Sequence, residues 1–129
     1  RTDNKKKIIQ SLKRDPRWNN QYRFVEIPKN IKPSFMGLPI FLNENMNKEM
    51  KMKLLFHLES QGIETRPILT GNFLNQPSIK LFGLNNKKLK FKGAQSIEDL
   101  GFLIGLHTKK ITQKQLDLIK NSLLLIDSF

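Results

Sequence analysis

Residues 62–73, GIETRPILTGNF, bring together side chains suited to binding a polar ligand. Glu64 and Arg66 stand two apart in a short β-like run, and alternation along a strand points both to the same face. Arginine recognises carboxylates or phosphates through a planar pair of N–H donors, while a neighbouring glutamate can orient it and accept a hydroxyl hydrogen bond. Gly71 and Asn72 follow with a turn. The pattern favours recognition of a polar small molecule such as a sugar; the alternative is an exposed ion pair contributing about 0–1 kcal/mol.

The remaining chemistry of the chain is sparse. His57 lies on or beside the apolar stripe of an expected helix, where a structural role is the interpretation we favour. His107 ends an expected strand, at an edge where ligand groups collect, and is a candidate binding residue. The chain has two histidines and no cysteine, so the sequence predicts no metal site. It also lacks a glycine-rich phosphate loop and a nucleophile elbow, and we predict no catalytic residue.

The basic composition raises a second class of function. The net charge is +12, which is typical of proteins that bind nucleic acid or another anion. The basic residues lie in scattered clusters, however, and the aromatic residues do not interleave with them as base-stacking platforms would. We therefore favour a solvated basic surface, with no nucleic-acid partner, and keep a free-standing binding module for nucleic acid or an acidic protein as the alternative. The dependence of binding on ionic strength would distinguish the nucleic-acid module from a sugar-binding domain, because phosphate-backbone binding weakens steeply as ionic strength rises.

The length of 129 residues is that of one domain with one modest core. The longest apolar run, residues 122–126, is too short to span a bilayer, and the chain does not open on an apolar leader. The sequence therefore predicts a soluble, cytoplasmic domain without a membrane partner.

Hydrophobic periodicity and capping residues predict the elements that position these side chains. Residues 18–33 are expected to form an irregular connection, and residues 83–93 a mobile loop. The expected regular elements are a helix over 5–13, a strand over 34–43, a helix capped by Asn47 and ended by Gly62, a strand over 64–68, a short helix over 77–82, a single turn over 96–99 capped by Ser96, a strand over 101–106, and a helix from Thr112 to 126.

Three strands with helices on one face predict an α+β two-layer sandwich on a small antiparallel sheet. The apolar face of the last helix is expected to close the core against the sheet. Its members are Leu116, Ile119, Leu123 and Ile126.

Three stretches, PSFMGLPIFL, LESQGIETRPILTGNFLNQP and LGFLIGLHTKKITQKQLDLI, resemble the C-terminal small domain of the DegT/DnrJ/StrS family. These are pyridoxal-phosphate-dependent sugar aminotransferases and dehydrases. The resemblance covers nearly the whole chain and is most specific over 58–77, where the Gly71–Asn72 pair is similar to the branch containing the nucleotide-sugar 3-dehydrases. It implies the fold of the C-terminal domain of fold-type I pyridoxal-phosphate enzymes. Residues 1–16 would be the end of an inter-domain helix, and residues 17–129 the small domain.

The resemblance also implies a substrate and the residues that contact it. The residues that would face the active-site cleft and bind a nucleotide-linked keto-deoxy sugar are Glu64, Arg66, Asn72, Ser34 and His107. The parent enzyme would act as a homodimer in the synthesis of cell-surface polysaccharide or lipopolysaccharide precursors. Pyridoxal phosphate would be bound by a large domain that this sequence does not include. The chain alone is therefore expected to bind no cofactor and to be inactive, and the choice between aminotransferase and dehydrase depends on a residue of that large domain.

Overall fold

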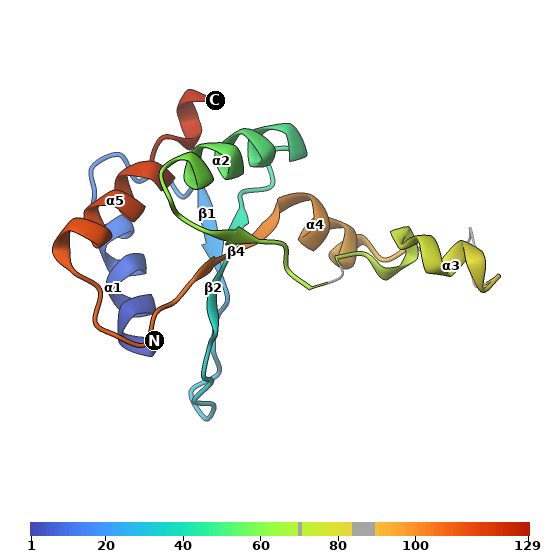
Figure 1. The fold of residues 1–129 in the computed structure, drawn as a ribbon, viewed down its shortest axis with the longest axis horizontal. Helices are drawn as coiled ribbons and strands as arrows, with labels where there is room; N and C mark the ends of the chain where they lie inside the picture. Colours follow the sequence, from blue (N-terminus) through green and yellow to red (C-terminus); the bar gives the residue numbers. More distant parts are fainter. Residues whose placement is uncertain (70, 84–89) are drawn as a thin grey trace.

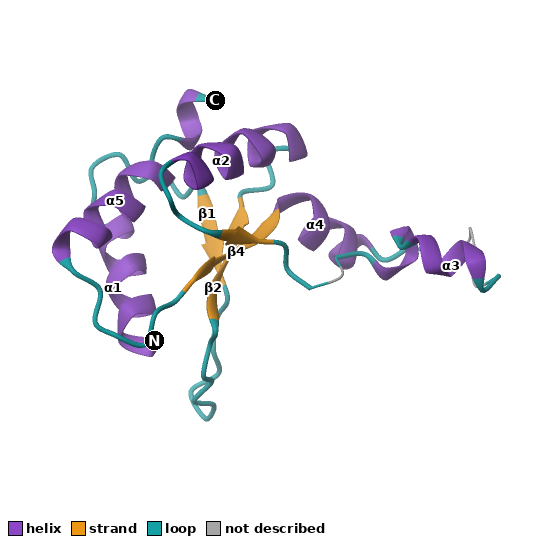
Figure 2. Ribbon diagram, in the orientation of Figure 1, coloured by secondary structure: helices purple, strands orange, loops and turns teal. Residues whose placement is uncertain are grey.

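The structure is a computed structural model that describes residues 1–69, 71–83 and 90–129. Helices pack beside a small sheet, and one segment extends away from the body (Figures 1 and 2). In chain order the elements are α1 (Thr2–Lys13), β1 (Tyr22–Phe24), β2 (Gly37–Leu42), α2 (Lys48–Ser60), β3 (Thr65–Arg66), the 3₁₀ turn η1 (Phe73–Asn75), α3 (Pro77–Leu81), α4 (Lys92–Leu100), β4 (Gly101–Gly105), α5 (Gln113–Leu123) and the 3₁₀ turn η2 (Ile126–Ser128).

The four strands form one antiparallel sheet in the order β1-β2-β4-β3. In the register Ile40 pairs with Phe102, and Leu38 pairs with Ile104. These four side chains are at most 1% exposed, so they form the inner face of the sheet. The other face is more open, since Leu103 on β4 is only half-buried. The predicted α+β class is thus confirmed, with a fourth strand added to the expected three.

The helix layer closes the core from one side. Figure 2 shows α1, α2 and α5 on the same side of the sheet, and α5 packs against both α1 and α2. The fully buried residues that these helices supply to the common core are Ile8, Leu12, Leu54, Leu58 and Leu123. Within the described ranges, no helix has the length and apolar character needed to cross a membrane.

Local capping chemistry sets the ends of two helices as the sequence predicts. The Asn47 side chain accepts a hydrogen bond from the Met50 amide at 2.9 Å, which begins α2. Gly62, just beyond its end, adopts φ +76°, the left-handed conformation that glycine takes without strain. Thr112 and Gln115 begin α5 by a reciprocal capping box.

Other expectations were wrong at the boundaries. Residues 18–33 contain the short strand β1, which is stabilised by a distant contact: the Tyr22 hydroxyl donates to the Leu123 carbonyl oxygen at 2.6 Å. α4 begins at Lys92, so Ser96 lies inside the helix instead of capping a single turn. β3 is only two residues long because Pro67, directly after it, has no N–H to donate to the sheet.

The C-terminal region differs from the expected continuous helix. α5 ends at Leu123, and Ile126 belongs to the separate 3₁₀ turn η2. Leu123 and Ile126 are both 0% exposed and confirm the expected core, whereas Leu116 and Ile119 are half-buried against it. Most of the expected 83–93 loop, residues 84–89, lies outside the described residues.

A buried asparagine ties the start of the chain to the connection between β4 and α5. The Asn4 side-chain amide donates to the carbonyl oxygens of His107 at 2.9 Å and Lys109 at 2.7 Å. Its side-chain oxygen accepts from the Ile111 amide at 3.0 Å. Asn4 is 4% exposed, so these bonds satisfy the polar atoms of a side chain that water scarcely reaches.

The core assignment gives a direct prediction for α5. Leu123→Ala is expected to lower the free energy of unfolding by on the order of 2–5 kcal/mol, because it leaves a cavity in the common core. Leu118→Ala on the same helix is the matched control, since Leu118 is 40% exposed; its cost is expected to stay below about 1 kcal/mol. Urea unfolding of both variants measures the difference, and equal losses would show that α5 is not anchored through Leu123.

A second prediction concerns the ion pair after α1. Arg17 donates to Asp15 through its side chain at 2.8 and 2.9 Å and through its backbone N–H at 3.1 Å. These bonds hold the pKa of Asp15 well below its usual value. A carboxyl group whose pKa is lower in the folded than in the unfolded state stabilises the fold when the pH is above its unfolded-state pKa. This stabilisation is lost as the pH falls from the unfolded-state pKa through the folded-state pKa.

Asp15→Asn is therefore expected to lower the Tm at pH 7, and the gap to the parent chain should narrow as the pH is lowered toward about 2. Thermal melts across this range measure the gap. A Tm difference that does not change with pH would contradict the electrostatic origin.

Candidate functional site: a pocket beside the Glu64–Arg66 pair

Glu64 and Arg66 lie side by side, as alternation predicts. The Arg66 Nε donates to Glu64 Oε1 at 2.9 Å, and its Nη2 donates to the same oxygen. Arg66 pairs in register with the half-buried Leu103 of β4, which puts it on the open face of the sheet. Both charged side chains are exposed, by 73% for Arg66 and 68% for Glu64. Such an ion pair contributes little to stability, but it orients the guanidinium and leaves it accessible to a ligand.

Asn72, the third of the predicted site residues in this segment, lies in a nearly buried environment. It is 7% exposed. Its side-chain oxygen accepts from the Leu74 amide at 3.2 Å, and its side-chain amide donates to Gln95 Oε1 at 2.9 Å. Its backbone N–H donates to Glu98 Oε2 at 2.7 Å. In this structure Asn72 shapes the turn over 71–76 and fastens it to α4.

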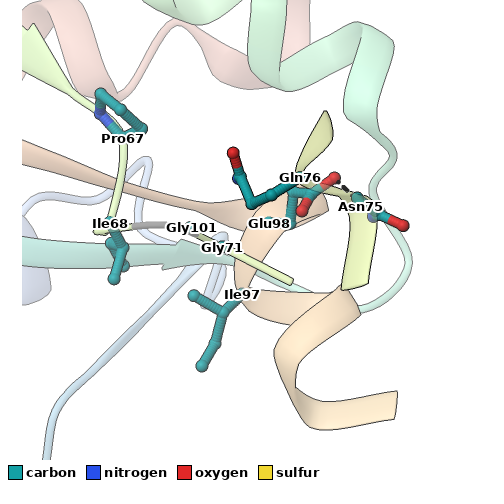
Figure 3. A pocket seen from close by; sticks show the side chains of 8 residues that line it. All are labelled: Pro67, Ile68, Gly71, Asn75, Gln76, Ile97, Glu98 and Gly101. Atoms are coloured by element: carbon teal, nitrogen blue, oxygen red, sulfur yellow. Dashed lines mark hydrogen bonds between the residues drawn. The ribbon is translucent and has the colours of Figure 1, made fainter. Parts of the chain in front are cut away.

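A pocket of about 420 Å³ opens directly after Arg66, between the 67–76 segment and α4. Its apolar walls are Pro67, Ile68 and Ile97 (Figure 3). Asn75, Gln76 and Glu98 supply the polar part of the lining, with Gly71 and Gly101 between them. Apolar walls with a few fixed polar groups are typical of small-molecule sites.

Glu98 is the centre of the polar lining. Its Oε2 accepts from the Asn72 backbone N–H, and its Oε1 accepts from the Asn75 side-chain amide at 2.9 Å. Gln95, one turn earlier in α4, accepts from the side-chain amides of both Asn72 and Asn75. The carboxylate is thereby held at the pocket wall by two residues of the 71–76 turn.

Ser34 and His107 lie at the opposite end of β4 from the pocket. β4 runs from Gly101, which lines the pocket, to Gly105, and His107 follows it. Ser34 is exposed in the β1–β2 connection, which meets the same end of β4 where the Leu106 amide donates to the Met36 carbonyl oxygen at 3.3 Å. His107 Nδ1 accepts from the Lys109 amide at 2.9 Å. The five predicted site residues therefore form no single cluster: Glu64, Arg66 and Asn72 flank or support the pocket, and the other two do not.

The other histidine, His57, packs against the C-terminal residue. The ring centroid of His57 lies 5.6 Å from that of Phe129. Its Nε2 is buried and has no hydrogen-bond partner among the described residues. His57 is not part of the pocket lining, and its half-buried position on α2 agrees with the structural role that the sequence favours.

Sequence reasoning missed Gln95, Glu98 and Asn75. The expected turn over 96–99 gave no reason to place residues 95 and 98 on one face. A helix beginning at Lys92 does, because residues three apart are neighbours on a helical surface. No capping side chain marks the start of that longer helix, so the sequence offered no local signal for it.

No protein-family model and no curated protein matches the sequence. Solved structures do match the fold. One is E. coli GDP-4-keto-6-deoxy-D-mannose-3-dehydratase with bound hydrated pyridoxal phosphate, with a TM-score of 0.71, 22% identity and 95% of this chain covered. Another is a GDP-4-keto-6-deoxymannose-3-dehydratase variant with bound GDP-perosamine, with a TM-score of 0.71, 23% identity and 95% of this chain covered. The chain spans 29% and 30% of the length of these enzymes.

The residues that the structure describes do not fit a pyridoxal-phosphate site. Two of their lysines are buried, Lys5 and Lys51, and burial lowers the pKa of each. The Lys5 Nζ lies 4.0 Å from the ring centroid of Phe35, and the Lys51 Nζ donates to the Glu98 carbonyl oxygen. Neither lysine lines the pocket, so we assign no cofactor chemistry to the described residues.

The contact between Gly71 and Glu98 yields a prediction. Gly71 has φ +55°, and a Cβ there would lie 2.9 Å from Glu98 Oε2 and 3.0 Å from Glu98 Cβ. Gly62 has φ +76° but nothing within 4 Å of the same position. Gly62→Ala is expected to cost about 1–2 kcal/mol through backbone strain alone, and Gly71→Ala more, because it also displaces Glu98. Thermal melts compare the Tm values of the two variants. An equal decrease in Tm for both would contradict the close packing of the turn on α4.

Proposed function

We propose that this chain is the substrate-side C-terminal domain of a pyridoxal-phosphate-dependent enzyme of the DegT/DnrJ/StrS family. The substrate is a nucleotide-linked keto-deoxy sugar, and the parent enzyme is a sugar dehydratase or aminotransferase. The observation that carries the proposal is the exposed Glu64–Arg66 pair beside a pocket with a fixed carboxylate. It lies on a fold similar to that of GDP-4-keto-6-deoxymannose-3-dehydratases, of which one was solved with bound hydrated pyridoxal phosphate and another with bound GDP-perosamine.

In this proposal the chain binds substrate and another part of the parent polypeptide binds the cofactor. Residues 1–16 are the end of an inter-domain helix, and residues 17–129 are the small domain. Pyridoxal phosphate supplies the electron sink when bound in the large domain. The parent is a cytoplasmic homodimer that contributes to cell-surface polysaccharide or lipopolysaccharide precursors.

The contribution of this chain is recognition and orientation. Arg66 extends from the open face of the sheet with its Nε and Nη2 aligned by Glu64, so its remaining N–H donors suit a phosphate or paired hydroxyl groups. Glu64 keeps acceptor capacity for a sugar hydroxyl, because a carboxylate offers about four acceptor positions. Asn72 acts through the turn that it stabilises.

Whether the parent is an aminotransferase or a dehydratase is decided by one residue of the large domain. A lysine at the position that carries the cofactor supports transamination, whereas another base there supports dehydration. The coding sequence upstream of Arg1 tests this. An upstream sequence without any cofactor-binding domain would remove the basis of the proposal.

Arg66→Lys tests the recognition role. Lysine keeps the charge but lacks the planar fork, so affinity for GDP-mannose is expected to fall about ten-fold or more with little change in Tm. Arg23→Lys is the matched control, because Arg23 is an exposed sheet arginine paired with Glu44. Chemical-shift titration of the ¹⁵N-labelled chain measures the affinities, and kcat/KM does so in the parent enzyme. Affinities within two-fold of the parent value would reduce Glu64 and Arg66 to a surface ion pair.

The division between substrate and cofactor binding gives a further test. Dialysis of the chain after incubation with pyridoxal phosphate is expected to remove all visible absorbance of the cofactor, since any imines formed with exposed lysines are reversible. Absorbance that survives dialysis and maps to one lysine by peptide mass analysis would contradict the assignment.

A further inference from the structure

The Glu98 carboxylate has unused acceptor capacity inside the pocket. A carboxylate offers about four acceptor positions. The described residues place one donor on each oxygen, the Asn72 backbone N–H at 2.7 Å and the Asn75 side-chain amide at 2.9 Å. The same carboxylate belongs to the pocket lining (Figure 3). Two adjacent oxygens therefore remain able to accept hydrogen bonds from a ligand.

This carboxylate is positioned before any ligand arrives. Asn72, one of its donors, is itself buried and bonded to Gln95. The absence of a side chain on Gly71 lets the 71–76 turn pack directly on Glu98. A polar group fixed in this way loses little conformational entropy when it binds a ligand.

The walls around Glu98 favour a flat, partly apolar group. Pro67, Ile68 and Ile97 are apolar, and a volume of about 420 Å³ is enough for a purine ring. Among the nucleobases, an edge that complements two adjacent acceptors must present two adjacent N–H donors. Guanine does so through N1–H and its 2-amino group, whereas adenine and cytosine present one donor beside one acceptor, and uracil and thymine present one donor between two acceptors.

We infer that this pocket binds the guanine base of a nucleoside diphosphate, with Glu98 accepting hydrogen bonds from N1–H and the 2-amino group. The inference rests on the proposed function and extends it from nucleotide sugars in general to guanine in particular. Arg66 directly precedes Pro67 of the pocket wall, and in this proposal its exposed guanidinium binds the phosphates of a nucleotide whose base occupies the pocket. The net charge of +12 favours such an anion.

The experiment titrates the ¹⁵N-labelled chain with GDP, IDP, ADP and UDP at one ionic strength. GDP is expected to bind at least about ten-fold more tightly than the other three, because hydrogen bonds to a charged group strongly discriminate between ligands. IDP is the sharpest comparison, since it differs from GDP only in lacking the 2-amino group. The backbone amides of Asn72 and Asn75 and the side-chain amide of Gln95 are expected to shift with GDP.

Glu98→Gln replaces one acceptor oxygen by a donor and should abolish the preference for GDP over IDP. Glu49→Gln is the matched control: it makes the same change of charge at an exposed position of α2 and should leave the preference intact. The ligand series on the unaltered chain decides the matter even if Glu98→Gln fails to fold. Equal affinities for GDP, IDP, ADP and UDP would overturn the guanine assignment and leave the proposed function standing. Failure of all four nucleotides and of GDP-mannose to bind would overturn both.

Discussion

The hydrogen bonds that Glu98 receives from the 71–76 turn determine the shape of the pocket. The turn carries few apolar contacts of its own: Phe73 is 57% exposed, although Asn72 is buried. Glu98 is fixed more firmly, because α4 passes without a loop into the central strand β4 and Lys51 of α2 donates to the Glu98 carbonyl oxygen. The core therefore holds α4 in place, and Glu98 on α4 holds the turn. Removal of the carboxylate would leave the Asn72 N–H buried without its partner, at a cost of about 1–3 kcal/mol.

The sheet explains why Arg66 and the pocket share one region of the surface. β4 pairs with β2 on one side and with β3 on the other, and its first residue, Gly101, lies where a Cβ would come within 2.6 Å of the Ile97 carbonyl oxygen and 2.8 Å of Ile68 Cδ1. Glycine at this position lets the segment after β3 approach the end of α4. The inner face of the same strands is filled by helices. The surfaces at this end of the sheet that the helices leave open are therefore the outer face and the edge beside it.

The sequence predicted best what depends on local chemistry. Asn47, Gly62 and Thr112 act through their own backbone surroundings, and all three positions appear as expected. The alternation that pairs Glu64 with Arg66 is equally local. β1 and the start of α4 could not be predicted from local chemistry. β1 is held by pairing with β2 and by a hydrogen bond to Leu123. At the start of α4 the Phe91 side chain supplies no capping hydrogen bond.

The candidate site follows the same division. Arg66 was a candidate because its neighbours along the chain give it a context, whereas Glu98 is positioned by residues 23 and 26 positions away. The buried environment of Asn72 depends on its contacts with α4 and is not apparent from the sequence. Tertiary contacts of this kind leave no period or spacing in the sequence.

The bonds of Asn4 have a consequence for the order in which the chain folds. They join α1 to residues 107–111, more than 100 positions away, so they can form only after most of the chain has collapsed. Closing so long a loop costs conformational entropy before any contact rewards it. We therefore expect docking of α1 on α5 to be a late step, and its separation from the remaining core to be the first event in unfolding. Protection of the Ile111 amide from hydrogen exchange would then report the opening of the N-terminal helix and not global unfolding.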